Sequence, residues 1–92
     1  MPYTFEWDPN KAAENERKHG VSFEEASTAF EDPRSLTIFD PDHSDTEDRY
    51  VLLGMSAQGN LLVVIHTERG DNIRIVSSRS ADRRESTQYS QN

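Results

Sequence analysis

The sequence predicts an α+β fold: an antiparallel sheet of four to five strands, two N-terminal helices packed on one of its faces, and a short C-terminal helix. The apolar run at residues 61–66 indicates a strand buried on both faces, because Gly59 and Gly70 bracket it too closely for an ordinary helix. Two capped helix patterns precede this run, and strand patterns flank it. A chain of 92 residues has room for one modest core, so we expect a single domain over residues 1–92.

The first strand and the first helix are predicted by the opening residues. Alternation of aromatic and polar side chains at residues 3–7 indicates a short strand. Asp8 can cap the free N–H groups of a helix, and Pro9 suits a first helical position. We therefore expect a helix from about residue 10 to residue 19, ended by Gly20 in the left-handed conformation.

A second helix is expected to open at residues 22–25, where a serine followed by a glutamate three residues later is typical of a capping box. Phe23, Ala26 and Phe30 form a narrow apolar stripe along this helix. The Asp-Pro pair at residues 32–33 ends it, because proline disfavours the helical conformation of the residue before it.

The second half of the chain is expected to complete the sheet. Strands are predicted at residues 35–39, 49–55, 61–66 and 73–79. An acidic loop at residues 40–48 separates the first two of these strands. Ser80 or Asp82 is expected to cap a short last helix, and residues 86–92 are expected to fray.

The hairpin between the last two strands determines which side chains meet. A three-residue loop at 69–71 would place His66 opposite Arg74 and keep polar and apolar side chains on separate faces. The polar face, turned away from the first two helices, would then carry His66, Glu68, Arg74 and Ser78. The apolar face, covered by the helices, would carry Val63, Ile65, Ile73 and Ile75.

Charge and composition restrict the possible partners and compartments. A net charge of −7 argues against non-specific binding of nucleic acid. A local cluster able to hold one phosphate is nevertheless present in the second half, at Arg49, Arg69, Arg74, Arg79, Arg83 and Arg84. The chain has no cysteine, which fits a reducing compartment, and no apolar run near the ~20 residues that span a bilayer. We therefore expect a cytoplasmic protein.

An exposed strand face with an imidazole, a carboxylate and a guanidinium group suits cleavage of a phosphodiester. RNA cleavage without a metal ion needs a base for the 2′-hydroxyl, a cation for the developing negative charge and an acid for the leaving oxygen. His66 or Glu68 is the candidate base, and Arg74 and Arg79 are the candidate charge clamp. The alternative is a ladder of solvated salt bridges, which is common on exposed strands.

Other polar clusters also allow two interpretations. Lys18 and His19 end the first helix, where cations compensate the helix dipole, although both could reach toward the sheet. Arg83 belongs most simply to a solvated helix face, with phosphate contact as the second interpretation. The loop at 40–48 could attract a hard cation, but it lacks the glycine and spacing of a calcium loop. Within this loop, residue types of a hydrolase triad occur without a nucleophile elbow at Asp40, His43 and Ser44.

Several segments together form a specific pattern. The first part comprises Phe5-Glu6-Trp7-Asp8-Pro9-Asn10-Lys11-Ala12, then Asn15, then Lys18-His19-Gly20-Val21-Ser22-Phe23-Glu24-Glu25-Ala26. The second part comprises Asp42-His43-Ser44, Glu47, Arg49, Gly54, Ser56, Val63-Val64, His66-Thr67-Glu68-Arg69, Arg74-Ile75-Val76-Ser77-Ser78-Arg79 and Arg83-Arg84-Glu85. In combination these segments resemble the BrnT family of type II toxins over roughly residues 5–89.

The resemblance implies a RelE-like ribonuclease fold and a metal-independent endoribonuclease that arrests translation by cutting RNA, without a cofactor. It implies a BrnA-type antitoxin with a ribbon-helix-helix DNA-binding domain, and a dimeric or heterotetrameric complex that represses its own operon through the antitoxin. By position, the family's polar pattern is matched at Lys18, His19, His66, Glu68, Arg74, Arg79 and Arg83. We assign catalysis to His66, Glu68, Arg74 and Arg79, and RNA binding to Lys18, His19, Arg69 and Arg83.

Two features depart from this resemblance. Toxins of this broader fold are often basic, whereas this chain is acidic, and its last residues, 85–92, are poor in charge. A second function class is therefore considered, in which the chain is a catalytically weak binding module that serves the antitoxin and the operator.

Overall fold

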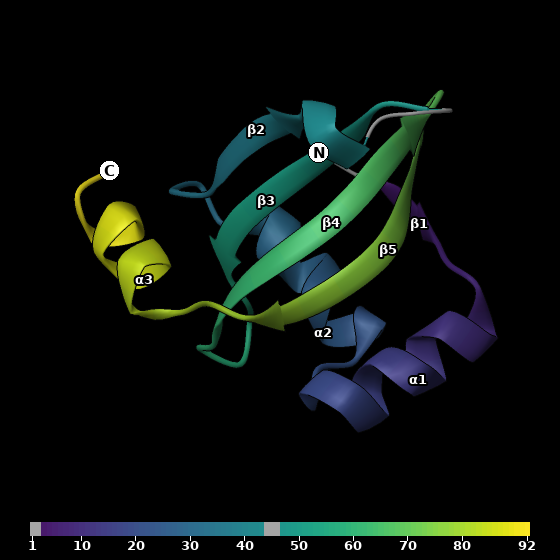
Figure 1. Cartoon of the computed structure of the whole chain (residues 1–92), viewed down its shortest axis with the longest axis horizontal. Coiled ribbons are helices and arrows are strands. Elements are labelled where there is room, and N and C mark those ends of the chain that lie inside the picture. The colour runs from purple at the N-terminus through teal and green to yellow at the C-terminus, as the bar shows by residue number, and fades with distance from the viewer. Residues whose placement is uncertain (1–2, 44–46) are drawn as a thin grey trace.

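The computed structural model describes residues 3–43 and 47–92 (Figure 1). Its elements, with η for a 3-10 helix, are β1 (Thr4–Glu6), α1 (Pro9–His19), α2 (Phe23–Thr28), η1 (Ala29–Glu31), β2 (Leu36–Asp40), η2 (Pro41–His43), β3 (Arg49–Met55), β4 (Leu61–Arg69), β5 (Asn72–Ser80) and α3 (Arg83–Ser90). The α+β class predicted from the sequence is confirmed. No helix in the described ranges is long and apolar enough to cross a membrane.

The five strands form one sheet in the order β1-β5-β4-β3-β2. The apolar run lies in β4, which is the central strand, as predicted. The expectation of a purely antiparallel sheet is wrong, because β1 pairs with β5 in parallel. Hairpins and short loops set the directions of the other strands, whereas β1 is connected to its neighbour only through the rest of the chain.

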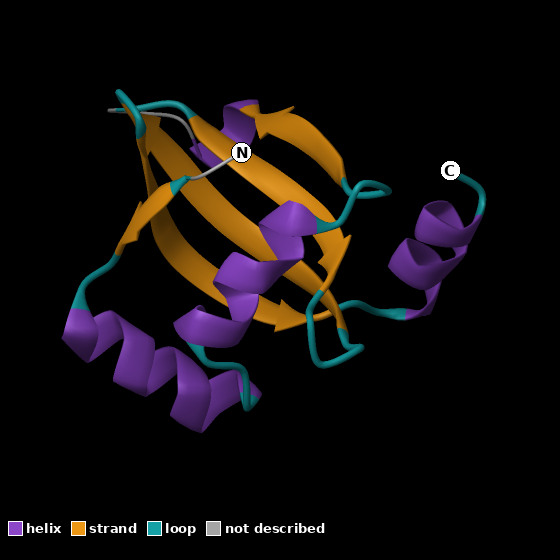
Figure 2. Ribbon diagram, turned by 180° about the vertical axis from the view of Figure 1, so that it is seen from behind, coloured by secondary structure: helices purple, strands orange, loops and turns teal. Residues whose placement is uncertain are grey.

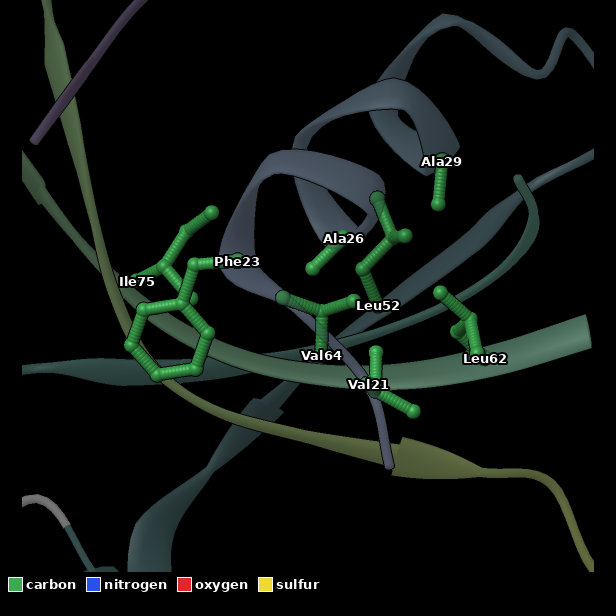
Figure 3. Close-up of a cluster of buried hydrophobic side chains, with 8 residues drawn as sticks. All are labelled: Val21, Phe23, Ala26, Ala29, Leu52, Leu62, Val64 and Ile75. Atoms are coloured by element: carbon green, nitrogen blue, oxygen red, sulfur yellow. The ribbon is translucent and has the colours of Figure 1, made fainter. Parts of the chain in front are cut away.

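Helices α1 and α2 lie on one face of the sheet, and α2 runs across the strands (Figure 2). The core lies between this helical layer and the sheet, and Figure 3 shows its members: Val21, Phe23, Ala26, Ala29, Leu52, Leu62, Val64 and Ile75. Gly54 of β3 permits the close approach, because a Cβ atom there would lie 2.8 Å from the carbonyl oxygen of Ala29. The glycine is therefore explained by packing rather than by a turn.

Local capping chemistry begins and ends the N-terminal helices. The Asp8 carboxylate accepts a hydrogen bond of 2.8 Å from the Asn10 N–H, and Gly20 ends α1 with φ of +72°. Ser22 caps α2, but the expected reciprocal capping box is absent from this described helix. The Glu25 carboxylate instead accepts hydrogen bonds of 2.7 Å from Ser56 and Asn60. The glutamate thus fastens α2 to the β3–β4 turn.

The C-terminal segment is ordered by its own contacts. Asp82, rather than Ser80, caps α3 and forms a reciprocal capping box with Glu85. Helix α3 continues to Ser90, and two hydrogen bonds join Asn92 to Arg34, while the expected fraying of residues 86–92 stays a prediction. Figure 1 shows α3 apart from α1 and α2, and it contacts β3.

The register predicted for the β4–β5 hairpin is also wrong. Gly70, with φ of +63°, opens a two-residue turn, so that Arg69 pairs with Asn72 and His66 pairs with Ile75. A β-bulge follows, because Ile65 pairs with Ser77 and leaves Val76 as an extra residue. His66 consequently lies on the helix-covered face, and Arg74 lies on the opposite face.

Candidate functional site

The face of the sheet turned away from α1 and α2, which we call the open face, carries a row of polar residues. The strand registers place one residue of each strand in this row, in the order Glu6, Arg74, Thr67, Arg49 and Asp40. Paired residues on neighbouring strands point to the same face of a sheet. We call these five residues the charged row, and they form the candidate site.

Ion pairs connect one end of the charged row to the hairpin. Arg74 Nη1 lies 3.0 Å from Glu6 Oε2, and Asn72 Nδ2 donates to Glu6 Oε1 over 3.1 Å. Arg69 donates to both carboxylate oxygens of Glu47 over 3.1 and 3.3 Å. These hydrogen bonds hold the pKa of Glu6 and that of Glu47 below the usual glutamate value. Both groups are therefore carboxylates at neutral pH.

Thr67 occupies the middle of the charged row. It is 0% exposed, and within the described residues its Oγ1 atom has no hydrogen-bond partner. Register places it between Arg49 on β3 and Arg74 on β5. A buried hydroxyl is thus positioned between two guanidinium-bearing residues.

Two hollows meet at the β-bulge. One hollow of about 220 Å³ lies on the open face and is lined by Asp40, Arg49, Ile65, Val76 and Ser77. The other, of about 250 Å³, lies along α1 and is lined by Lys11, Glu14, Asn15, Lys18, His19, Val76 and Ser77. Because Val76 and Ser77 line both hollows, the bulge connects the charged row with the basic end of α1. Bulges often redirect side chains beside functional sites.

His66 does not share a face with the arginine proposed from the sequence. Its side chain is 2% exposed and packs between the rings of Phe30 and Tyr50, with ring centroids 4.8 and 5.9 Å away. Burial lowers the pKa of the imidazole below its usual value, so the ring is neutral at pH 7. In this geometry His66 stabilises the helix-covered side and does not face the charged row.

The remaining predicted residues lie in separate places. Glu68 is exposed near the hairpin tip, opposite Ile73 and on the side that carries His66. Arg79 shares the open face with Arg74, but four residues of β5 lie between them, so their Cα atoms are about 15 Å apart at the usual strand rise. Arg79 instead pairs with both carboxylate oxygens of Glu85 at 2.8 and 2.9 Å. The two arginines therefore do not lie next to each other on the strand, and each pairs with a different glutamate.

All four predicted RNA-binding residues are exposed, three of them on helices and one at a strand end. Lys18 and His19 lie in the last turn of α1, and Arg83 is the first residue of α3. Arg69 lies at the end of β4 and pairs with Glu47, as described above. Ser44 and Asp45 of the acidic loop lie outside the described residues, and no group of three possible metal ligands occurs among those described.

Sequence reasoning missed Asn15 and Glu6. Asn15 is buried on α1, donates to the carbonyl oxygens of Val21 and Ser78, and accepts from the Ser78 N–H. Its position three residues after Ala12, on the inward side of α1, was the available signal. Glu6 was placed correctly between two aromatic residues of a strand, but its partner Arg74 is 68 residues away. Only the parallel β1–β5 pairing reveals that contact.

The fold and the site together define a small α+β protein that carries a row with two arginines on the sheet face opposite α1 and α2. A family model described as "Ribonuclease toxin, BrnT, of type II toxin-antitoxin system" matches residues 7–85. The chain belongs to this family of type II toxins. A similar solved structure is the ribonuclease toxin BrnT of Brucella abortus, with 22% identity, a TM-score of 0.64, and coverage of 89% of this chain and 100% of that chain. No curated protein matches the sequence.

Proposed function

We propose that this chain is a toxin that cleaves RNA without a metal ion, and that the charged row binds the scissile phosphate. Family membership supports the class of activity. The observation that carries the site is the placement of Arg49 and Arg74 on the open face, one on each side of Thr67. Guanidinium groups match phosphate oxygens in geometry and charge. A RelE-like architecture, with catalysis on the open sheet face, is part of this proposal.

The charged row also supplies a carboxylate for the first proton transfer. In the proposed step Glu6 takes the proton of a ribose 2′-hydroxyl, and the 2′-oxygen forms a bond to phosphorus. The bond from phosphorus to the 5′-oxygen breaks, and that oxygen takes a proton from water. Arg74 and Arg49 stabilise the negative charge that develops on the phosphate oxygens. The products are a 2′,3′-cyclic phosphate and a 5′-hydroxyl end.

The ion pairs of the free chain do not prevent this binding. Arg74 is about one-third exposed in its pair with Glu6, and exposed ion pairs contribute little to stability. A phosphodiester can therefore replace the carboxylate at small cost. The hollows around the bulge extend the proposed RNA path from the charged row to Lys18 and His19. Arg69 and Arg83 are proposed as outer contacts that attract the strand through their charge.

As a type II toxin, the chain acts with an antitoxin partner. We propose a BrnA-type ribbon-helix-helix antitoxin, with which the toxin forms a dimeric or heterotetrameric complex that represses its own operon. Two exposed apolar side chains on the edge strand β2 support partner binding, since Ile38 and Phe39 are 61% and 47% exposed, one on each face of the sheet. In this proposal the complex contacts operator DNA through the antitoxin alone.

Two measurements test the proposed activity. The purified chain is incubated with single-stranded RNA in the presence of a chelator, and the ends of the products are identified. Induction of the chain in a host without the antitoxin gene is followed by growth curves. RNA cut to cyclic phosphate ends, together with growth arrest, is the expected result. Intact RNA at high enzyme concentration would contradict it.

A catalytically weak binding module remains the second candidate, and one observation favours it. Each of the three open-face arginines with a described ion pair is neutralised by a glutamate: Arg69 by Glu47, Arg74 by Glu6 and Arg79 by Glu85. Together with the net charge of −7, these pairs oppose RNA binding at a distance. Unaffected growth on induction, combined with tight antitoxin binding, would favour this alternative.

A further inference from the structure

We propose that Thr67 is a phosphate-binding residue, whose side-chain hydroxyl forms one subsite with the guanidinium groups of Arg49 and Arg74. The proposal rests on the function proposed above and adds a residue that neither the family description nor the sequence pattern assigns. The occupant of this subsite is the phosphate group of an RNA strand.

The hydroxyl group of Thr67 is costly for the fold. Thr67 is completely buried and its Oγ1 atom has no partner within the described chain. Such a group destabilises a fold, and valine has nearly the same shape without this penalty. A hydroxyl at this position is therefore explained by a ligand that bonds to it.

The cross-strand neighbours of Thr67 distinguish it from the other buried hydroxyl group without a partner. The other unpartnered buried hydroxyl in the described ranges belongs to Ser78, which pairs with Val64 on the helix-covered face. Thr67 instead has arginines as both cross-strand neighbours on the open face. Neighbouring strands lie about 4.8 Å apart, so the Cα atoms of Arg49 and Arg74 are about 10 Å apart, with Thr67 midway. Two arginine side chains can converge on one anion over that span.

Access to the hydroxyl requires only side-chain movement. Arg74 is a long, flexible residue whose side chain is 32% exposed, and its contact with Glu6 is a partly exposed ion pair. When a phosphate replaces Glu6 as its partner, the guanidinium group can move aside and leave room for an oxygen above Thr67. The hollow beside Arg49, lined by Ile65 and Val76, provides space for the adjoining nucleoside.

The test compares Thr67→Val, which removes the hydroxyl, with Thr67→Ser, which retains it. Inorganic phosphate and a 2′-O-methyl RNA oligonucleotide, which cannot be cleaved, are titrated into the full chain and followed by backbone amide NMR. Thr67→Val is expected to weaken both affinities by about ten- to a hundredfold, the effect of one hydrogen bond to a charged group. Thr67→Ser is expected to bind like the wild type. Equal affinity of Thr67→Val, or no phosphate binding by the wild type, would overturn the proposal.

Thermal unfolding separates this role from a structural one. Thr67→Val should melt at or above the wild-type temperature, because it removes a buried hydroxyl that has no partner. A lower melting temperature would show that the hydroxyl bonds within the fold, and would also overturn the proposal. Phosphate binding through Thr67 without any RNA cleavage would leave this subsite standing while the proposed function fails. Equal RNA cleavage by wild type and Thr67→Val would support the proposed function while the Thr67 subsite fails.

Discussion

The phenolic hydroxyl of Tyr89 donates a hydrogen bond of 2.6 Å to Oδ2 of Asp32. The same carboxylate accepts from the backbone N–H groups of Met55 and Arg34 over 2.8 and 2.9 Å. Burial alone would raise the pKa of Asp32, but the hydrogen bond from Tyr89 and those from the two backbone groups outweigh it and lower the pKa. One carboxylate therefore connects α3, β3 and the loop before β2.

Tyr89→Phe should weaken the attachment of α3. A hydrogen bond to a charged group that is partly exposed contributes about 1 kcal/mol, which corresponds to a fall of about 4–8 °C in melting temperature for a domain of this size. The matched control is Tyr3→Phe, since the Tyr3 hydroxyl has no hydrogen bond among the described contacts and its side chain is exposed. Circular dichroism melts compare the two variants. Equal melting temperatures would show that α3 is held by other contacts.

Glu85 should make the attachment of α3 sensitive to acid. The hydrogen bonds from Arg79 lower the pKa of Glu85 from 4.5 to about 2. Because the pKa is lower in the folded state, the unfolded state binds more protons between these values. The stabilising contribution is therefore complete above about pH 4.5 and disappears as the pH falls toward about 2.

The measurement is the free energy of unfolding by urea as a function of pH, for wild type and Glu85→Gln. Glutamine preserves the capping-box position but does not titrate. The difference between the two curves isolates Glu85 from other carboxylates with lowered pKa values. The difference in free energy of unfolding should shrink as the pH falls from about 4.5 toward about 2. A difference that stays constant would contradict the lowered pKa of Glu85.

Local chemistry explains which features the sequence could reveal. The caps at Asp8 and Gly20 depend on neighbouring residues only, so their residue types were sufficient to place the ends of α1, and Asp82 was one of two candidates for the cap of α3. The central position of β4 followed from an apolar run that only a strand buried on both faces accommodates. These features need no knowledge of distant partners.

The site depends on contacts that leave no local signal. Val76 forms the bulge, yet a valine fits a regular strand equally well, so nothing in the sequence indicated the extra residue. The separation of His66 from Arg74 has another cause: the turn at Gly70 has two residues instead of the expected three, which shifts the pairing by one residue and moves His66 to the other face. The parallel pairing of β1 likewise brought Glu6 to Arg74 across most of the chain. Arg74 was thus predicted as a site residue, but its neighbours in the sheet, Glu6 and Thr67, were not.

Asn15→Ala should destabilise the protein strongly. The side chain satisfies two carbonyl groups and one N–H group in a buried position between α1 and β5. Leaving buried backbone groups without partners costs about 1–3 kcal/mol each, so for three groups we expect a loss of about 3 kcal/mol or more, measured by urea unfolding. Glu16→Ala, at the adjacent exposed position of α1, is the control and should change stability by less than about 0.5 kcal/mol. Similar curves for both variants would refute the bridging role.

His66→Phe should preserve toxicity and change the pH dependence of stability. The phenyl ring can occupy the slot between Phe30 and Tyr50. Burial lowers the pKa of His66 in the folded state. Below about pH 6.5 the unfolded state therefore binds a proton at this residue more readily than the folded state does, and the free energy of unfolding falls. Melts between pH 7.5 and about 5 should show this fall in the wild type and less of it in His66→Phe. The exposed His19→Gln variant should behave like the wild type.

Growth arrest on induction completes the test of His66. A folded His66→Phe protein that no longer arrests growth would restore the imidazole as a candidate base. It would also require a rearrangement that exposes the ring, because the side chain is 2% exposed.

Arg74 should be the most sensitive residue for catalysis. Loss of one preorganised donor to a developing negative charge typically costs about 10²–10³ in rate, so Arg74→Ala should abolish growth arrest. Arg74→Lys keeps the charge but loses the two-pronged geometry, and we expect an intermediate loss. Neither change should unfold the protein, because the ion pair with Glu6 is partly exposed and contributes little to stability.

The controls for Arg74 distinguish a specific contact from a general effect of charge. Arg84→Ala removes the same charge from an exposed position on α3 and should leave RNA cleavage unchanged. Arg79→Ala should have a smaller effect than Arg74→Ala, because Arg79 lies farther along β5 and pairs with Glu85. Cleavage rates on a synthetic RNA, together with circular dichroism melts, provide the comparison. Full cleavage activity in a folded Arg74→Ala protein would rule out the charged row as the catalytic site. Equal losses of cleavage rate in Arg74→Ala and Arg84→Ala would show that only net charge matters.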